Sequence, residues 1–212
     1  YRNLLSFSFL LLALTAWAQP NGTGNYYQDA NGKKGKSLKT ALFGIIKSPN
    51  VVSYKGLWDA YKKTDLRSDG KIWDMYSDIT NFDPDKGHAG NYSKEGDMYN
   101  REHSFPKSWF NDAKPMYSDI VHVVPADGYV NNRRSNLPYG ETDGTWKSHG
   151  SVSKLGACSL PGHSGTVFEP NDEYKGDFAR IYFYMATCYE DKISSWSSDM
   201  LSHTSYPAYK QW

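Results

Sequence analysis

The chain has 212 residues, which is enough for one domain with a sizeable core, or one domain with a short extension. Its formal net charge is only +1, so overall charge gives no argument for a nucleic-acid partner; only local clusters of basic residues could. The 17 Tyr and 7 Trp make it rich in amphipathic rings, which fill cores more often than they stack on bases.

Residues 1–18 have the features of a secretory signal peptide. Arg2 precedes an apolar run from Leu4 to Thr15, and Ala16-Trp17-Ala18 forms a small-x-small cleavage site. The apolar run is too short to span a membrane comfortably. We therefore expect a secreted or periplasmic protein with no membrane association after removal of the signal.

The next segments predict a leader followed by two packing helices. Residues 19–36 are rich in Gly, Asn and Gln and predict a flexible leader. Ser37 is a suitable N-cap for a helix whose apolar residues fall on one face: Leu38, Leu42, Ile45 and Ile46. A second helix is predicted over residues 54–63, with Leu57, Trp58 and Tyr61 as its buried stripe.

The central region predicts short strands separated by long irregular segments. Asp69-Gly70 indicates a turn before a strand over residues 71–77. Residues 79–100 predict a surface loop of a length that is often functional. Residues 117–125 are the clearest strand, and residues 130–136 suit a short helix or turn.

The last third of the chain predicts one irregular stretch and one long helix. Residues 140–165 show no regular pattern, whereas residues 174–190 place apolar side chains at the helical period. The predicted class is α+β, with more helix than sheet. We expect the catalytic domain to cover residues 37–212; because the sequence begins at Tyr rather than Met and stops at Trp212, we expect it to be truncated at the C-terminus.

Three short stretches carry residues suited to phosphodiester hydrolysis: Asn100 to Phe110, Asp119 to Pro125 and Asn131 to Asn136. Such hydrolysis needs a base that takes a proton from water and a cation that neutralises charge growing on the phosphate. Histidine suits the first task because its pKa, about 6.5, is close to neutrality. Magnesium suits the second and is held by one or two oxygen ligands, such as those of Glu102 and Asn131.

Glu102 and His103 present a geometric difficulty, because neighbours in a regular strand point to opposite faces. They could serve one site if the backbone is irregular, or if the metal and the water approach from different sides. Pro106 and the loop before residue 100 favour an irregular backbone. Taken alone, the pair is more often a surface Glu beside a half-buried His. His122, on the apolar strand, is more simply explained as a structural histidine.

Three separate blocks of the sequence closely resemble the endonuclease I family of secreted bacterial nucleases, which have the ββα-metal fold. The blocks are Arg-Glu-His-x-x-Pro-x-Ser-Trp-Phe from Arg101, Val-Asn-x-x-Arg-Ser-Asn from Val130, and a set of C-terminal matches: Phe168-Glu169-Pro170, Lys175-Gly176-Asp177-x-Ala179-Arg180 and Phe183-Tyr184-Met185. The resemblance runs from about Leu38 to Trp196. It implies a ββα-metal core with surrounding helices and long irregular loops, and cleavage of DNA, and often RNA, with little sequence preference.

The resemblance also implies roles for individual residues. His103 matches the general base, Glu102 the metal-binding carboxylate before it, and Asn131 the asparagine that opens the helix and completes the metal site. We expect Asn131, rather than Asn132 or Asn136, to bind the metal with Glu102. The expected metal is Mg²⁺, with Ca²⁺ and Mn²⁺ as alternatives.

The sequence departs from the family pattern at the phosphate contact. Some relatives carry an arginine for this purpose between the histidine and the asparagine, but none lies between His103 and Asn131 here. The candidate nucleic-acid-binding residues are Arg101, Lys107, Arg133, Arg134 and Arg180. Of these Arg133, Arg134 and Arg180 are the candidates for the missing phosphate contact. Glu169 and Arg180 are also a candidate pair that would fix the long helix near the site.

Cys158 and Cys188 are the only cysteines in the chain, and two readings of them stay open. In an oxidising compartment they are a candidate disulfide; otherwise they are two unpaired buried thiols. A bridge would close a loop of about thirty residues and stabilise the fold by roughly 3–4 kcal/mol.

Two other functions remain as alternatives to a monomeric nuclease acting on DNA, RNA or both. One is a phosphoesterase that uses the same base and metal on phospholipids or nucleotides. The other is an exported module that binds carbohydrate or nucleic acid through its aromatic rings and catalyses nothing.

Overall fold

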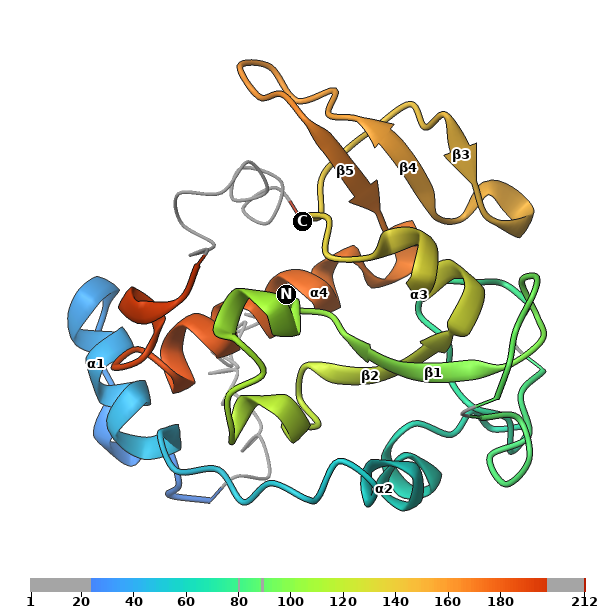
Figure 1. The fold of residues 1–212 in the computed structure, drawn as a ribbon. Coiled ribbons are helices and arrows are strands. Elements are labelled where there is room, and N and C mark those ends of the chain that lie inside the picture. Colours follow the sequence, from blue (N-terminus) through green and yellow to red (C-terminus); the bar gives the residue numbers. More distant parts are fainter. Residues whose placement is uncertain (1–23, 80, 89, 198–211) are drawn as a thin grey trace, which may run out of the picture.

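The computed structural model describes residues 24–79, 81–88, 90–197 and 212 (Figure 1). The predicted signal peptide and residues 19–23 of the predicted leader lie outside the described residues. In the described part of the leader, Gln28–Ala30 form a short 3-10 helix, and the first α-helix begins at Gly35.

Four α-helices and two small antiparallel sheets form the described part of the fold, which is therefore α+β, as predicted. The helices are α1 (Gly35–Ile46), α2 (Leu57–Thr64), α3 (Gly128–Arg134) and α4 (Lys175–Cys188). One sheet pairs β1 (Tyr99–His103) with β2 (Val123–Asp127); the other has the order β3 (Trp146–Lys147), β4 (Lys154–Ala157) and β5 (Thr166–Glu169). Further 3-10 helices cover Lys107–Phe110, Met116–Ser118, His149–Ser151, Asp172–Tyr174 and Ile193–Ser195. No described helix is long and apolar enough to cross a membrane.

The unit formed by β1, β2 and α3 positions the site described below. β1 and β2 pair in antiparallel register, with Glu102 opposite Val124. α3 follows β2 without a loop, and the carboxylate of Asp127 caps it by accepting hydrogen bonds from two backbone N–H groups of its first turn. In Figure 1 this unit lies beside α4, while α1 packs near the other end of that helix.

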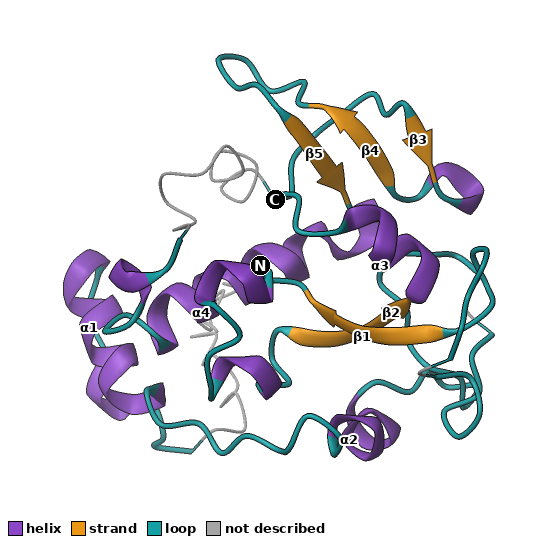
Figure 2. Cartoon of the chain, viewed as in Figure 1, coloured by secondary structure: helices purple, strands orange, loops and turns teal. Residues whose placement is uncertain are grey.

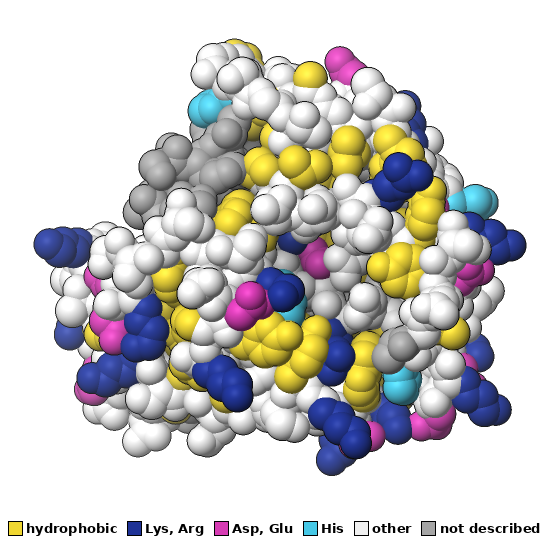
Figure 3. Space-filling model, viewed as in Figure 1, with side chains coloured by type: hydrophobic (Ala, Val, Ile, Leu, Met, Phe, Trp, Pro, Cys, Tyr) yellow, Lys and Arg dark blue, Asp and Glu magenta, His cyan; other side chains and the backbone are white. Residues whose placement is uncertain are grey.

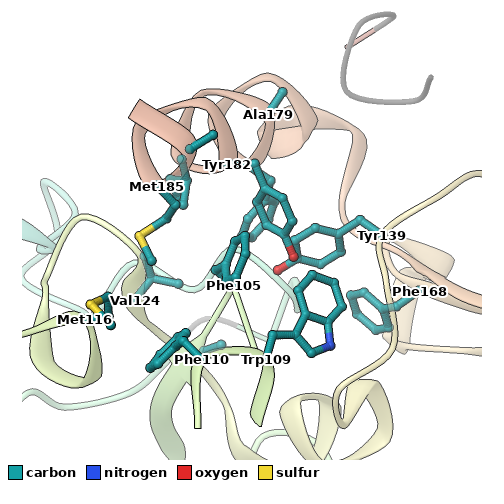
Figure 4. Close-up of a cluster of buried hydrophobic side chains, with 14 of the residues drawn as sticks. Phe105, Trp109, Phe110, Met116, Val124, Tyr139, Phe168, Ala179, Tyr182 and Met185 are labelled. Atoms are coloured by element: carbon teal, nitrogen blue, oxygen red, sulfur yellow. The ribbon is translucent and has the colours of Figure 1, made fainter. Parts of the chain in front are cut away.

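The main hydrophobic core lies between this unit and α4. Figure 4 shows Phe105, just after β1, among Tyr182 and Met185 of α4 and Val124 of β2. The 3-10 helix after Pro106 buries both Trp109 and Phe110. The segment after β1 is thus anchored by its aromatic side chains.

The helices α1, α2 and α4 form where apolar periods predict them, although Ser37 lies inside α1, whose N-cap is Lys34, and α2 begins only at Leu57. Other assignments are wrong. Residues 71–77 form no strand: they contain only an isolated bridge at Ile72, and the carboxylate of Asp74 accepts hydrogen bonds from two following backbone N–H groups, which turns the chain. The predicted strand over residues 117–125 begins only at Val123, after a 3-10 helix and a turn. The stretch predicted as irregular, residues 140–165, contains β3 and β4, whereas the long connection before β1 is mostly loop (Figure 2).

Candidate active site

A cavity of about 400 Å³ borders β1, the segment after β1 and α3. Its lining residues come from these elements and from the chain before α2: Tyr54, Asn100, Arg101, Glu102, His103, Pro106, Lys107, Ser108, Asn131, Ser135 and Asn136. In Figure 3, basic, acidic and histidine side chains meet near the centre of the face that is shown, beside exposed hydrophobic side chains. The cavity brings together the three residues to which the sequence assigns catalysis.

Four successive residues of β1, Asn100 to His103, border this cavity although the strand is regular. The prediction of an irregular backbone at Glu102 and His103 is therefore wrong. Among the described strands β1 pairs only with β2, and the one described bridge at its other edge is an isolated one at Tyr99, at the start of the strand. Side chains from both faces of a strand can border a cavity at its free edge, and this resolves the difficulty that adjacent residues pose.

His103 is buried, and its ring is oriented by a backbone carbonyl. Nε2 lies 3.0 Å from the carbonyl oxygen of Tyr117. A carbonyl oxygen can only accept, so Nε2 carries the hydrogen and the neutral ring has its lone pair on Nδ1. Burial, followed by the nearby ring of His122, lowers the pKa of His103 to about 3. The imidazole is thus neutral near pH 7, with an unprotonated Nδ1.

Glu102 is fully buried and held at one oxygen. Its Oε1 accepts a hydrogen bond of 2.7 Å from the hydroxyl of Tyr76 and one of 2.6 Å from the guanidinium of Arg134. Burial raises the pKa of Glu102, whereas Arg134 and Tyr76 oppose this rise by favouring the carboxylate. Oε1 accepts both of these hydrogen bonds, and Oε2 takes part in neither.

Arg134 supports the site from inside the protein, where a substrate cannot reach it. Its side chain has no exposed surface. Besides Glu102, it donates to the carbonyl oxygens of His103 (2.9 Å) and Ser104 (2.6 Å). The prediction that Arg134 contacts nucleic acid is therefore wrong, because its guanidinium is buried and its hydrogen bonds are donated to groups inside the protein.

Three tyrosines that the sequence did not single out complete this support. The hydroxyls of Tyr76 and Tyr139 hydrogen-bond to each other, and the hydroxyl of Tyr182 donates to Ser104 O at 2.7 Å. All three are fully buried. They come from three distant segments. Only the burial of Tyr182 could be predicted from the sequence, because it lies on the apolar face of the long helix. Nothing in the local sequence indicates that these hydroxyls contact Glu102, Arg134 and the backbone at Ser104, directly or through one another.

Asn131 lies on α3 and is half-buried at the cavity. Asn136 borders the same cavity, whereas Asn132 does not. Among the described residues, none hydrogen-bonds to the side-chain amide of Asn131, which leaves its oxygen free for a ligand.

The donors at the cavity are compatible with a hard cation that keeps most of its water. Within the described ranges, no three His, Cys, Asp or Glu side chains form a group that could hold a metal ion. One carboxylate from Glu102 and one amide from Asn131 are the oxygen ligands of the kind and number that Mg²⁺ uses when waters and phosphate complete its shell. Such a set fits Mg²⁺ better than Zn²⁺, which prefers nitrogen and sulfur ligands in a closed cage.

The sequence was also compared with known proteins. It matches the family described as Endonuclease I over residues 34–212. The chain belongs to the endonuclease I family.

This endonuclease I-family chain is 38% identical over 187 residues to an extracellular ribonuclease of Bacillus subtilis (strain 168), covering 85% of the chain and 59% of that protein. It is 35% identical over 173 residues to an extracellular ribonuclease of Bacillus amyloliquefaciens, covering 79% of the chain and 54% of that protein. A shorter match, 33% identical over 82 residues, is with Endonuclease-1 of Buchnera aphidicola subsp. Acyrthosiphon pisum; it covers 38% of the chain and 30% of that protein. The chain thus spans between half and two thirds of the two ribonucleases. No solved structure matches it significantly.

The other basic residues expected at the nucleic-acid surface of this endonuclease I-family chain are dispersed. Arg101 and Lys107 border the cavity. Arg133 is exposed on α3, where it donates to the hydroxyl of Tyr129 at 2.7 Å. Arg180 borders other cavities and pairs with Asp177 at 2.5 Å.

Two candidate pairs, Glu169 with Arg180 and Cys158 with Cys188, are not formed in the structure. Glu169 pairs with Lys154 and Lys175 rather than with Arg180. Cys158 and Cys188 are both free thiols, so the expected disulfide is absent. The thiol of Cys188 instead donates to the carbonyl oxygen of Ile46 at 3.2 Å, which ties α4 to α1.

Proposed function

We propose that this domain is a secreted, metal-dependent endonuclease that hydrolyses phosphodiester bonds of DNA, and of RNA, with little sequence preference. One observation carries the proposal: Glu102, His103 and Asn131 border a single cavity in a member of the endonuclease I family. A base and two oxygen ligands in one cavity can supply the proton acceptor and the cation site of metal-assisted hydrolysis.

His103 is the general base of this proposal. The bond from its Nε2 to Tyr117 O leaves Nδ1 as the atom that takes a proton from the attacking water. Burial keeps the ring neutral, so no proton must leave it before it can act. Tyr54 stacks on the imidazole with ring centroids 5.7 Å apart, and this contact also restrains the ring.

Glu102 and Asn131 are the residues that would hold the divalent cation. Mg²⁺ is the proposed cation, with Ca²⁺ and Mn²⁺ as alternatives; when bound, it would supply positive charge to the phosphate. Arg134 and Tyr76 orient the carboxylate of Glu102, so that this ligand is placed before the cation arrives. The succession of β1, β2 and α3 around these residues supports a ββα-metal core.

The names of the relatives support the proposed nucleic-acid substrate and the proposed secretion. Two relatives named extracellular ribonuclease favour secretion and action on RNA, and a relative named Endonuclease-1 favours internal cleavage. The signal-like residues 1–18 agree with secretion. We propose that the domain acts as a monomer on nucleic acid without membrane attachment.

The test is the nicking of supercoiled plasmid and the cleavage of a long single-stranded RNA by the purified chain. Each substrate is incubated with Mg²⁺, with Mg²⁺ and excess EDTA, and with Mg²⁺ restored after EDTA. We expect cleavage that EDTA stops and added Mg²⁺ restores. Cleavage that resists EDTA would overturn the metal dependence.

Parallel assays separate the alternatives. A phosphoesterase of another kind would leave plasmid and RNA intact while releasing phosphate from a phospholipid or a nucleotide. A binding module would retard plasmid in a gel without cutting it under any metal condition. Either result would overturn the proposal.

A further inference from the structure

The two basic residues that border the cavity differ in their partners. Lys107 pairs with Asp112 at 2.7 Å, and its side chain is about half exposed. Arg101 pairs with no carboxylate among the described residues, although it is only partly exposed. Arg101 is therefore a positive charge at the cavity that the described part of the protein does not neutralise.

Aromatic rings hold the guanidinium of Arg101 in place. Its Cζ lies 3.5 Å from the ring centroid of Tyr54 and 4.2 Å from that of Trp58. A terminal nitrogen donates to the carbonyl oxygen of Tyr54 at 2.6 Å, and Trp58 in turn stacks on His88, with ring centroids 4.4 Å apart. A planar guanidinium that is held in this way loses little freedom when it binds an anion.

The donor groups of Arg101 are not fully used by the protein. Its Nε–H is buried and has no hydrogen-bond partner among the described residues. Guanidinium groups bind phosphate through two parallel N–H···O bonds, which gives both affinity and orientation. Because the Nε–H is buried, the donors left for a phosphate are those of the terminal nitrogens, of which only one bonds to a described residue, at the carbonyl oxygen of Tyr54.

Tyr54 links this guanidinium to the catalytic histidine. The same ring that contacts Arg101 lies 5.7 Å from the imidazole of His103, at an interplanar angle of 25°, and 4.6 Å from the ring of Tyr117. Because Tyr54 and Trp58 are engaged by other protein groups, they are poorly placed to stack on bases. The ligand that this arrangement can recognise is the charged backbone.

We infer that Arg101 forms a phosphate-binding subsite beside Glu102 and His103, which takes one phosphodiester group of the bound strand. Tyr54 and Trp58 are its positioning residues. The inference rests on the proposed function and deepens it. Since every nucleotide carries the same phosphate, the subsite adds affinity without base preference.

The test measures binding in excess EDTA, so that cleavage does not interfere. A fluorescein-labelled single-stranded 12-nucleotide DNA of mixed sequence is titrated with wild-type protein by fluorescence anisotropy at several salt concentrations. Loss of one phosphate contact should make the slope of log K against log salt less negative by about 0.7. We expect this change for Arg101→Gln, with equal loss of affinity for oligo-dA and oligo-dT.

Matched variants separate the subsite from general charge and from folding. Arg67→Gln removes a positive charge outside the cavity, where Arg67 pairs with Asp69, and should leave the slope unchanged. Arg101→Lys keeps the charge but loses the planar stacking and paired donors, so it should bind between wild type and Arg101→Gln. Circular dichroism and thermal melting show whether each variant is folded.

The positioning residues are tested by rescue. Trp58→Leu should weaken binding and reduce the slope in the same direction as Arg101→Gln, and Trp58→Phe should restore most of both. In the cleavage assay, Arg101→Gln should raise KM several-fold with a smaller effect on kcat, because a phosphate contact is made before the transition state as well as in it.

The outcomes for the subsite and for the proposed function can be told apart. If a folded Arg101→Gln or Arg101→Lys binds with wild-type affinity and salt slope, or if wild type does not bind in EDTA at low salt, the subsite is wrong while nicking by wild type still supports the nuclease. If wild type binds with an Arg101-dependent slope but never cuts, the subsite survives and the nuclease does not.

Discussion

Arg134 donates a 2.6 Å hydrogen bond to Oε1 of Glu102, and neither side chain is more than 4% exposed. The contact joins the last turn of α3 to the end of β1. Because the same helix carries Asn131, the pair also sets where that amide lies relative to the carboxylate. The position of both candidate metal ligands therefore depends on a buried ion pair.

Arg134→Met should lower the free energy of unfolding by about 3–5 kcal/mol, because it leaves the carboxylate of Glu102 buried without its cationic partner. The measurement is urea denaturation followed by fluorescence. Arg133→Met, at the exposed neighbouring position, is the matched control and should change stability by about 0.5 kcal/mol or less. Equal stability of the two variants would show that the pair does not brace the fold.

His103→Ala should reduce plasmid cleavage by about 10²–10⁴-fold, because it removes the group that accepts the proton from water. Binding of DNA in EDTA should change little, since the imidazole contributes no charge at neutral pH. His149→Ala is the control, because His149 is exposed and outside the cavity. A folded His103→Ala protein that cuts at the wild-type rate contradicts the mechanism.

Asn131→Ala should raise the Mg²⁺ concentration needed for half-maximal cleavage by about tenfold or more, because the cation loses one of its two protein ligands. Asn132→Ala is the control, since its side chain does not border the cavity. Asn136→Ala tests the competing assignment, because Asn136 does border it. A Mg²⁺ requirement that shifts with Asn136 and not with Asn131 would reassign the ligand.

Two thiols per chain should react with a thiol reagent in denaturant without prior reduction, because Cys158 and Cys188 are unpaired. A reducing agent should accordingly leave the Tm unchanged, and Cys158→Ser should melt close to wild type. Recovery of thiols only after reduction would instead show a bridge.

The residues of the candidate site could be predicted from the order of the motifs, whereas the residues that support them could not. Glu102, His103 and Asn131 were assigned from their sequence context, and the structure brings all three to one cavity. The support from Tyr76 and Tyr139 had no local signal, because their hydroxyls come from segments 63 residues apart and meet only through folding. The same limit explains the strand wrongly predicted over residues 71–77, where side-chain bonds to the backbone override the alternating pattern.

The sequence by itself determined the helices α1 and α4, the α+β class and the positions of the three central motifs. These follow from residue type and short spacing, which act within a few turns of the chain. Only the tertiary structure decided that Arg134 is enclosed, that Arg101 borders the cavity without a carboxylate partner among the described residues, and that the two cysteines are not bonded to each other. Burial and charge pairing depend on which distant segments pack together, so two arginines of the same motif region differ in their surroundings: Arg134 is enclosed with Glu102, whereas Arg101 borders the cavity and is held by aromatic rings.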